Sequence, residues 1–182
     1  MVQVIDQLAR DHRNMRLLLD IIEAEMERYG EGRSPDFELL QMTARYILDY
    51  PDLIHHPKED MVFARLIERD PGAREAMSDL IADHRRLAEV TRRFAATIDD
   101  AARDVELPRV WLATLVQEFL HANRTHMQAE ERHFLPRAMA HLTESDWSEI
   151  DERISGRADP LFGEQRTSAY LRLHERILQQ QL

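Results

Sequence analysis

Residues 55–59 read His-His-Pro-Lys-Glu, and residues 126–130 read His-Met-Gln-Ala-Glu. In both segments a glutamate follows a histidine by four residues, and an Asp-His pair lies upstream, at positions 11–12 and 83–84. The second Asp-His pair lies 72 residues after the first, and the second His-x-x-x-Glu lies 71 residues after the first. These nearly equal offsets indicate two copies of one helix-hairpin unit. Four imidazoles and two carboxylates on four helices are typical of a two-metal site inside a helical bundle.

Helical geometry explains why this spacing suits a metal. Residues four apart lie on one face of a helix, about 6 Å apart along its axis. A carboxylate can bridge two ions, whereas a neutral imidazole binds one. The simplest arrangement therefore has two ions bridged by both glutamates. Each ion is then also bound by one histidine from an Asp-His pair and one histidine from a His-x-x-x-Glu segment. The candidate ligands are His12, His55, Glu59, His84, His126 and Glu130.

Some neighbouring residues leave alternatives open. His56 precedes Asp60 by the same spacing and could replace His55, although register with the second copy favours His55. Asp11 and Asp83 could orient metal-bound histidines, or they could be solvated, because adjacent helical residues point about 100° apart. Among the remaining histidines, one is expected at the polar rim of the site (His133) and three at the surface (His121, His141, His174). Tyr46 and Tyr50 are expected to pack in the core rather than to donate to a bound oxygen species.

The composition bounds the class of protein. With 182 residues, of which 43% are hydrophobic and 32% charged, the chain can form one domain with a substantial core. The net charge of −10 argues against a nucleic-acid partner, and no apolar run is long enough to span a membrane. The N-terminus does not resemble a signal peptide, so a cytoplasmic location is expected. Because there is no cysteine, a transition metal must be bound by His, Asp and Glu, which suits iron, manganese or zinc.

Apolar residues recur at three- and four-residue spacing, which predicts an all-α protein. Ser34 is expected to cap the second helix, and a bend is expected near Pro51, near Pro57 or near both. Short linkers predict antiparallel neighbours, and therefore an antiparallel up-down four-helix bundle with a helical C-terminal extension. The expected helices cover residues 4–28, 35–68, 73–100 and 108–141, with a short helix capped near residues 143–146 and a last one ending near residue 180.

At these residues the chain resembles the hemerythrin family, specifically the bacterial hemerythrin-like proteins with an HHE cation-binding domain. Residues 50–60, Tyr-Pro-Asp-Leu-Ile-His-His-Pro-Lys-Glu-Asp, are similar to the family's second-helix motif. Residues 126–136, with His-Met-Gln-Ala-Glu-Glu and then Phe-Leu-Pro, are similar to its fourth-helix motif. The two Asp-His pairs lie where the family has its single-histidine helices. The resemblance implies a hemerythrin-like bundle with an internal two-fold repeat over residues 1–141, and a packed helical extension over residues 142–182.

The resemblance also implies a non-haem di-iron centre held by the six candidate ligands, for which zinc or manganese could substitute. Oxygen-carrying hemerythrins have a second histidine four residues after the third helix's ligand, where this chain has Ala88. They use an acid five residues after the fourth helix's histidine, where this chain offers Glu131 beside Glu130. This departure argues against reversible oxygen carriage.

The expected function is a di-iron protein that binds or responds to oxygen, peroxide or nitric oxide, or that handles iron. Two alternatives stay open. One is an enzyme that reduces peroxide or oxygen at the metal centre. The other is a helical interaction module, such as a homodimer, with a structural metal.

Overall fold

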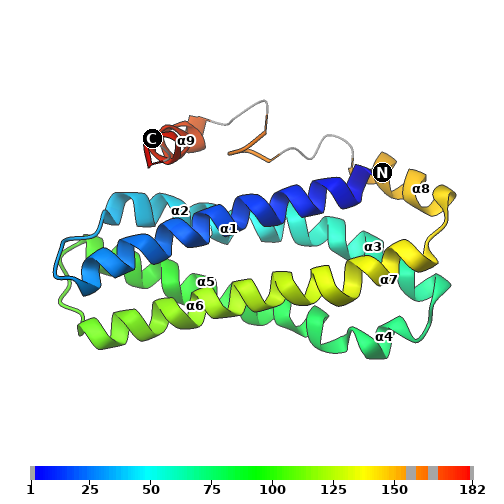
Figure 1. Ribbon diagram of the computed structural model, residues 1–182, viewed down its shortest axis with the longest axis horizontal. Coiled ribbons are helices and arrows are strands. Elements are labelled where there is room, and N and C mark those ends of the chain that lie inside the picture. The colour runs from blue at the N-terminus through cyan, green and yellow to red at the C-terminus, as the bar shows by residue number, and fades with distance from the viewer. Residues whose placement is uncertain (1–2, 155–158, 164–167, 181–182) are drawn as a thin grey trace.

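The computed structural model describes residues 3–154, 159–163 and 168–180. All regular secondary structure in these ranges is helical, so the prediction of an all-α protein is confirmed. Figure 1 shows the long helices side by side along the long axis of the molecule. Across the described ranges, every helix is too short or too polar to cross a membrane.

The first half of the chain forms two long helical stretches. Helix α1 (Gln3–Gly30) is continuous. The second stretch consists of α2 (Phe37–Tyr50), a π-helical turn η1 (Pro51–His55) and α3 (His56–Arg69). The expected cap at Ser34 is wrong. The cap is Asp36, whose carboxylate accepts from the Leu39 N–H at 3.0 Å, and the helix begins immediately after it.

The second half repeats this plan. A short helix α4 (Ala73–Ala76) precedes α5 (Ser78–Ala102), so the single helix expected after residue 72 is interrupted at Met77. A fourth long stretch consists of α6 (Arg109–Ala129), a second π-helical turn η2 (Glu130–Phe134) and α7 (Leu135–His141).

The two π turns have a common cause in the sequence. In each, the residue after the turn donates its N–H to the carbonyl five residues earlier. The next residue is a proline, Pro57 or Pro136, which has no N–H and whose ring would clash with the carbonyl four residues earlier in a regular α-helix. The wider turn relieves that clash without breaking the helix. Each π turn shares one residue with a His-x-x-x-Glu segment, His55 in the first and Glu130 in the second, and π bulges are frequent at functional sites.

The C-terminal helices contact the long helices at different places. Helix α8 (Glu144–Ile154) packs against α1 and α3. It starts with a reciprocal cap, in which the Thr143 N–H donates to Asp146 and the Asp146 N–H donates to the Thr143 hydroxyl, as expected for the cap near residue 143. Helix α9 (Ser168–Gln180) packs against α2, where Arg176 forms an ion pair with Asp36 (Figure 1).

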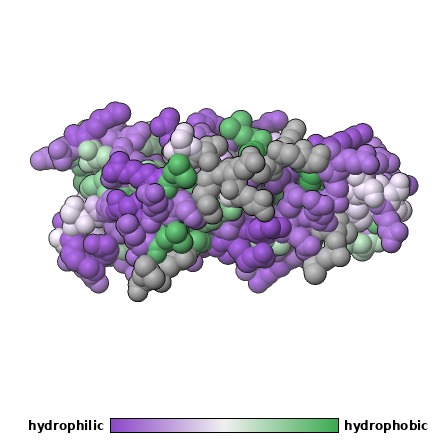
Figure 2. Space-filling model, turned by 90° about the horizontal axis from the view of Figure 1, so that it is seen from above, coloured by the Kyte–Doolittle hydropathy of each residue, from purple (hydrophilic) through white to green (hydrophobic). Residues whose placement is uncertain are grey.

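The apolar interior is divided into two clusters by a polar layer. Along α1, Leu8 belongs to one cluster and Met15 to the other, with His12 between them. Along the fourth long stretch, Met127 belongs to the same cluster as Met15, and Phe134 to the same cluster as Leu8. The surface, by contrast, is mostly hydrophilic on the face seen in Figure 2. The fold therefore brings buried ionisable side chains into one layer across the middle of the molecule.

Candidate metal centre

One half of the polar layer is a fully buried group of four side chains. His12 Nε2 lies 3.2 Å from His55 Nε2, 3.2 Å from Glu130 Oε2 and 3.8 Å from Glu59 Oε1. His55 Nε2 lies 3.4 Å from the same Glu59 oxygen. One potential ligand atom of each residue lies within 4.8 Å of the others, so the four could surround one metal ion.

The second half is a more open group that shares Glu59 with the first. It contains His56, His84 and His126, whose ligand atoms and one from Glu59 again lie within 4.8 Å of one another. His84 Nε2 lies 3.6 Å from Glu59 Oε2 and 3.6 Å from Glu130 Oε1, and His126 Nε2 lies 2.8 Å from Glu130 Oε1. Each glutamate therefore presents one oxygen to the first group and the other oxygen to the second, which is the disposition of a bridging carboxylate.

All six residues predicted from the spacing thus lie in one layer. His56 is present in addition to His55, not in its place. In a regular α-helix, adjacent side chains point about 100° apart. Here His55 ends the π turn and His56 begins α3, and both side chains reach the layer.

Two aspartates lie beside the outward-facing nitrogens of histidines on other helices, not beside the histidines that follow them in sequence. Asp11, which is next to His12 in sequence, instead contacts the Nδ1 of His55 at 3.2 Å. Asp83, next to His84, lies 4.0 Å from the Nδ1 of His126, which is too far for a hydrogen bond and leaves that nitrogen without one. Each Asp-His pair therefore brings one histidine to the layer and one acid to the histidine of another helix. Such carboxylate partners fix the orientation and tautomer of metal-binding imidazoles.

Acidic residues also lie beside the Nδ1 of two further histidines. The Nδ1 of His12 lies 3.0 Å from Glu131 Oε1, and Glu131 is itself held by Arg16 at 2.6 Å. The Nδ1 of His56 lies 3.1 Å from Asp52 Oδ1. Glu131, which the sequence left as an alternative to Glu130, thus contacts His12 from outside the layer. The sequence already indicated the Asp52–His56 contact, because these residues are four apart and residues four apart lie on one face of a helix.

The buried carboxylates change the protonation of the layer. Burial alone would lower the pKa of His12, but hydrogen bonding to Glu130 and Glu59 outweighs it and raises the pKa to about 10. The pKa of His84 is raised against burial by the same two acids. The pKa of Glu130 lies well below its usual range, because contacts with three histidines outweigh its burial. The layer is therefore a site of negative potential that must hold protons or another cation.

The donor atoms fit a metal better than they fit each other. Both carboxylate oxygens of Glu59, Glu130 Oε2 and His84 Nε2 are buried without an aligned hydrogen bond, although imidazole nitrogens and carboxylate oxygens lie 3.2 to 3.8 Å apart. Buried polar atoms in proteins are rarely left without a partner. A shared cation between them would satisfy these atoms together.

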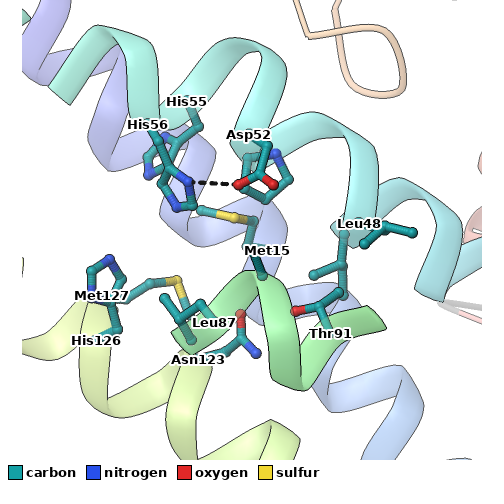
Figure 3. A pocket seen from close by; sticks show the side chains of 13 residues that line it. Met15, Leu48, Asp52, His55, His56, Leu87, Thr91, Asn123, His126 and Met127 are labelled. Atoms are coloured by element: carbon teal, nitrogen blue, oxygen red, sulfur yellow. Dashed lines mark hydrogen bonds and ion pairs between the residues drawn. The ribbon is translucent and has the colours of Figure 1, made fainter. Parts of the chain in front are cut away.

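Two small pockets border the layer. The first is lined by His55, His56 and His126 together with Ala88 and mainly apolar side chains, and Figure 3 shows the histidines converging from two sides of it. The second touches Glu59, His84 and Glu130 and is otherwise lined mainly by Phe63, Phe134 and Leu80. Each encloses a cavity of about 20 Å³, room for about one water-sized molecule.

Other candidates from the sequence are not among the residues whose ligand atoms converge in the layer. Tyr46 and Tyr50 are buried and stack on each other in the core, with ring centroids 5.1 Å apart. The Tyr46 hydroxyl donates to Asp159 at 2.9 Å, so it is engaged away from the polar layer. His121 and His141 are exposed, as expected, and His133 is exposed as well. His174, which was expected at the surface, is instead half-buried.

Comparison with known proteins adds a family. Residues 3–138 match the model of the hemerythrin HHE cation binding domain, which covers about three quarters of the chain. Comparisons with curated proteins and with solved structures gave no match. The matched range contains both histidine groups and both glutamates, and the resemblance expected from the sequence motifs is confirmed. The chain belongs to the hemerythrin HHE cation-binding domain family.

Proposed function

We propose that this protein holds two non-haem iron ions, bridged by Glu59 and Glu130, and uses them to bind or respond to oxygen, peroxide or nitric oxide. The fold that holds them is an antiparallel up-down four-helix bundle over residues 1–141, if each π turn is counted as part of one long helix. Within residues 142–182, helices α8 and α9 form an extension that packs on it. The observation that carries the proposal is the placement of both glutamates, each of which offers one oxygen to each histidine group.

Within this proposal, His12 and His55 bind one ion, and His84 and His126 bind the other. Nitrogen and carboxylate donors without thiolates suit iron, and manganese or zinc could occupy the same donors. When bound, iron supplies an open coordination position at which a small oxygen or nitrogen species can react. The protein's own residues hold and orient the donors: Asp11 positions the His55 ring, and Glu131 positions the His12 ring.

The pockets limit what can reach the site. Phe63 and Phe134 form an apolar wall beside the two glutamates, with ring centroids 6.2 Å apart. The space beside the layer is close to the size of one water molecule. A diatomic molecule or peroxide fits these dimensions. The proposed ligand class therefore follows from the size and apolar character of the approach.

The test uses protein loaded with ferrous iron without air. The expected result is a change in the visible and near-ultraviolet spectrum on addition of oxygen or nitric oxide, which addition of nitrogen gas does not produce. The variant that carries both Glu59→Ala and Glu130→Ala should show no such change. Sustained evolution of oxygen from peroxide would replace the binding role with an enzymatic one. A protein that binds zinc but gives no response with iron would leave the metal a structural role.

A further inference from the structure

We infer that His56 is a fifth imidazole ligand, so that the two metal positions are unequal, with two histidines at one and three at the other. This inference rests on the proposed two-metal centre and specifies its ligands further. The buried position has His12 and His55. The more open position has His84, His126 and His56.

The first support is the position of the His56 ring. It stacks on the His84 ring with centroids 4.0 Å apart and an interplanar angle of 13°. It meets the His126 ring edge to face, with centroids 6.1 Å apart at 85°. A ligand atom of His56 lies within 4.8 Å of those of Glu59, His84 and His126. Imidazoles from three different helical stretches thus lie together beside Glu59. Because a metal lies in the plane of the imidazole that binds it, the stacked His56 and His84 rings would turn apart when both bind one ion.

The second support is the orientation of the ring. The Nδ1 of His56 is engaged by Asp52 at 3.1 Å, on the outer side (Figure 3). That contact leaves Nε2 as the nitrogen available for a metal. The same division of roles is found at His12 and His55, each of which has an acid at Nδ1 and the layer at Nε2. His56 is therefore built like the other ligands, not like a surface histidine that happens to lie nearby.

The third support is the space around Ala88. This residue lies one helical turn after His84, so a longer side chain there would share the face of α5 that carries His84. The structure instead has a methyl group at that position and a pocket lined by both Ala88 and His56. An imidazole at residue 88 would therefore extend into the space beside His56. We expect that an imidazole at either residue 56 or residue 88 can supply the third histidine ligand of the more open metal position.

The test is titration of the metal-free protein with Co²⁺ against a competing chelator, with the visible spectrum as a measure of coordination. The parent should bind two equivalents. His56→Ala should keep the first and weaken the second by at least about tenfold, the lower end of what loss of even an outer partner costs. The control is His121→Ala, which removes an exposed histidine and should leave both equivalents unchanged. The double variant His56→Ala with Ala88→His should regain the second equivalent.

The outcomes separate this inference from the proposed function. If the parent binds two equivalents and His56→Ala binds both with unchanged affinity and spectrum, His56 is not a ligand while the two-metal centre stands. If the parent binds fewer than two, the proposed centre itself fails. Should His56→Ala lose its helical circular dichroism, Asp52→Ala takes its place, because it removes only the outer partner of His56. A second equivalent unaffected by Asp52→Ala would contradict the inference.

Discussion

Lys58→Met should destabilise the protein more than any surface substitution. Lys58 is the only lysine in a chain with 23 arginines, and it is 2% exposed. Its Nζ donates to Asp11 Oδ2 at 3.1 Å, and Asp11 is also buried. Methionine has a similar length but no charge, so the substitution leaves the Asp11 carboxylate buried with His55 as its remaining partner.

The magnitude follows from that loss of compensation. Removing one member of a buried ion pair costs about 3–5 kcal/mol, because the other charge stays behind in a poorly solvated place. The remaining contact with His55 places the expected value near the lower end, about 3 kcal/mol. For a chain of this length, 1 kcal/mol shifts Tm by about 2–4 °C, so Tm should fall by about 6–12 °C.

The assay is thermal unfolding followed by circular dichroism at pH 7, with a chelator present to remove metal. Arg13→Met is the control, since it removes an exposed cation and should change Tm little. Adding Asp11→Leu to Lys58→Met removes both charges and should restore part of the loss. A fall of less than about 1 kcal/mol for Lys58→Met would refute the reasoning that Lys58 compensates the buried charge of Asp11.

Three further predictions concern stability. The metal-free protein should lose stability as the pH rises from 6.5 towards about 10. The acids beside His12 raise the pKa of His12 in the folded state, and its protonated form is lost over that range. Thermal melts that do not change with pH would contradict this. Asp146→Asn should lower the free energy of unfolding by about 1–2 kcal/mol at pH 7, since it weakens the α8 cap and the contact with Arg69. That contact lowers the pKa of Asp146 below 3.8, and at lower pH the carboxyl loses the charge that asparagine also lacks. The free energies of unfolding of variant and parent, measured by denaturant titration, should therefore converge as the pH falls below that value. Tyr46→Phe removes the hydrogen bond to Asp159 and should cost about 0.5–1.5 kcal/mol, with faster amide exchange in residues 168–180; exchange equal to the parent's would count against the contact.

Periodicity and chain breaks were enough to predict the helices and their order, because those features are local. The cap of α2 was mispredicted since Ser34 and Asp36 both suit a helix start, and only the path of the chain shows which carboxylate or hydroxyl reaches a free N–H. The π turn before Pro57 was expected only as a bend, and the one before Pro136 was not expected. Proline predicts that a regular turn will be disturbed, but not whether the helix will widen or end.

That the six candidate ligands lie together could be predicted because duplication of His-x-x-x-Glu is a pattern in the sequence itself. Most partners of the histidines could not, since they join different helices. The Asp52–His56 contact, between residues four apart in one helical stretch, is the exception. Asp11 contacts His55, not the adjacent His12, and this depends on how α1 packs against the second helical stretch. The choice between His55 and His56 was likewise left open, because a regular helix admits only one of two adjacent side chains to a given face.

The central claim is that Glu59 and Glu130 hold two metal ions between them. Metal analysis of the iron-loaded protein after removal of loosely bound ions tests it most directly. We predict two iron ions per chain in the parent, and none in the variant that carries both Glu59→Ala and Glu130→Ala while keeping its helical circular dichroism. A parent with no bound iron, or a double variant that still holds two ions, would contradict the claim.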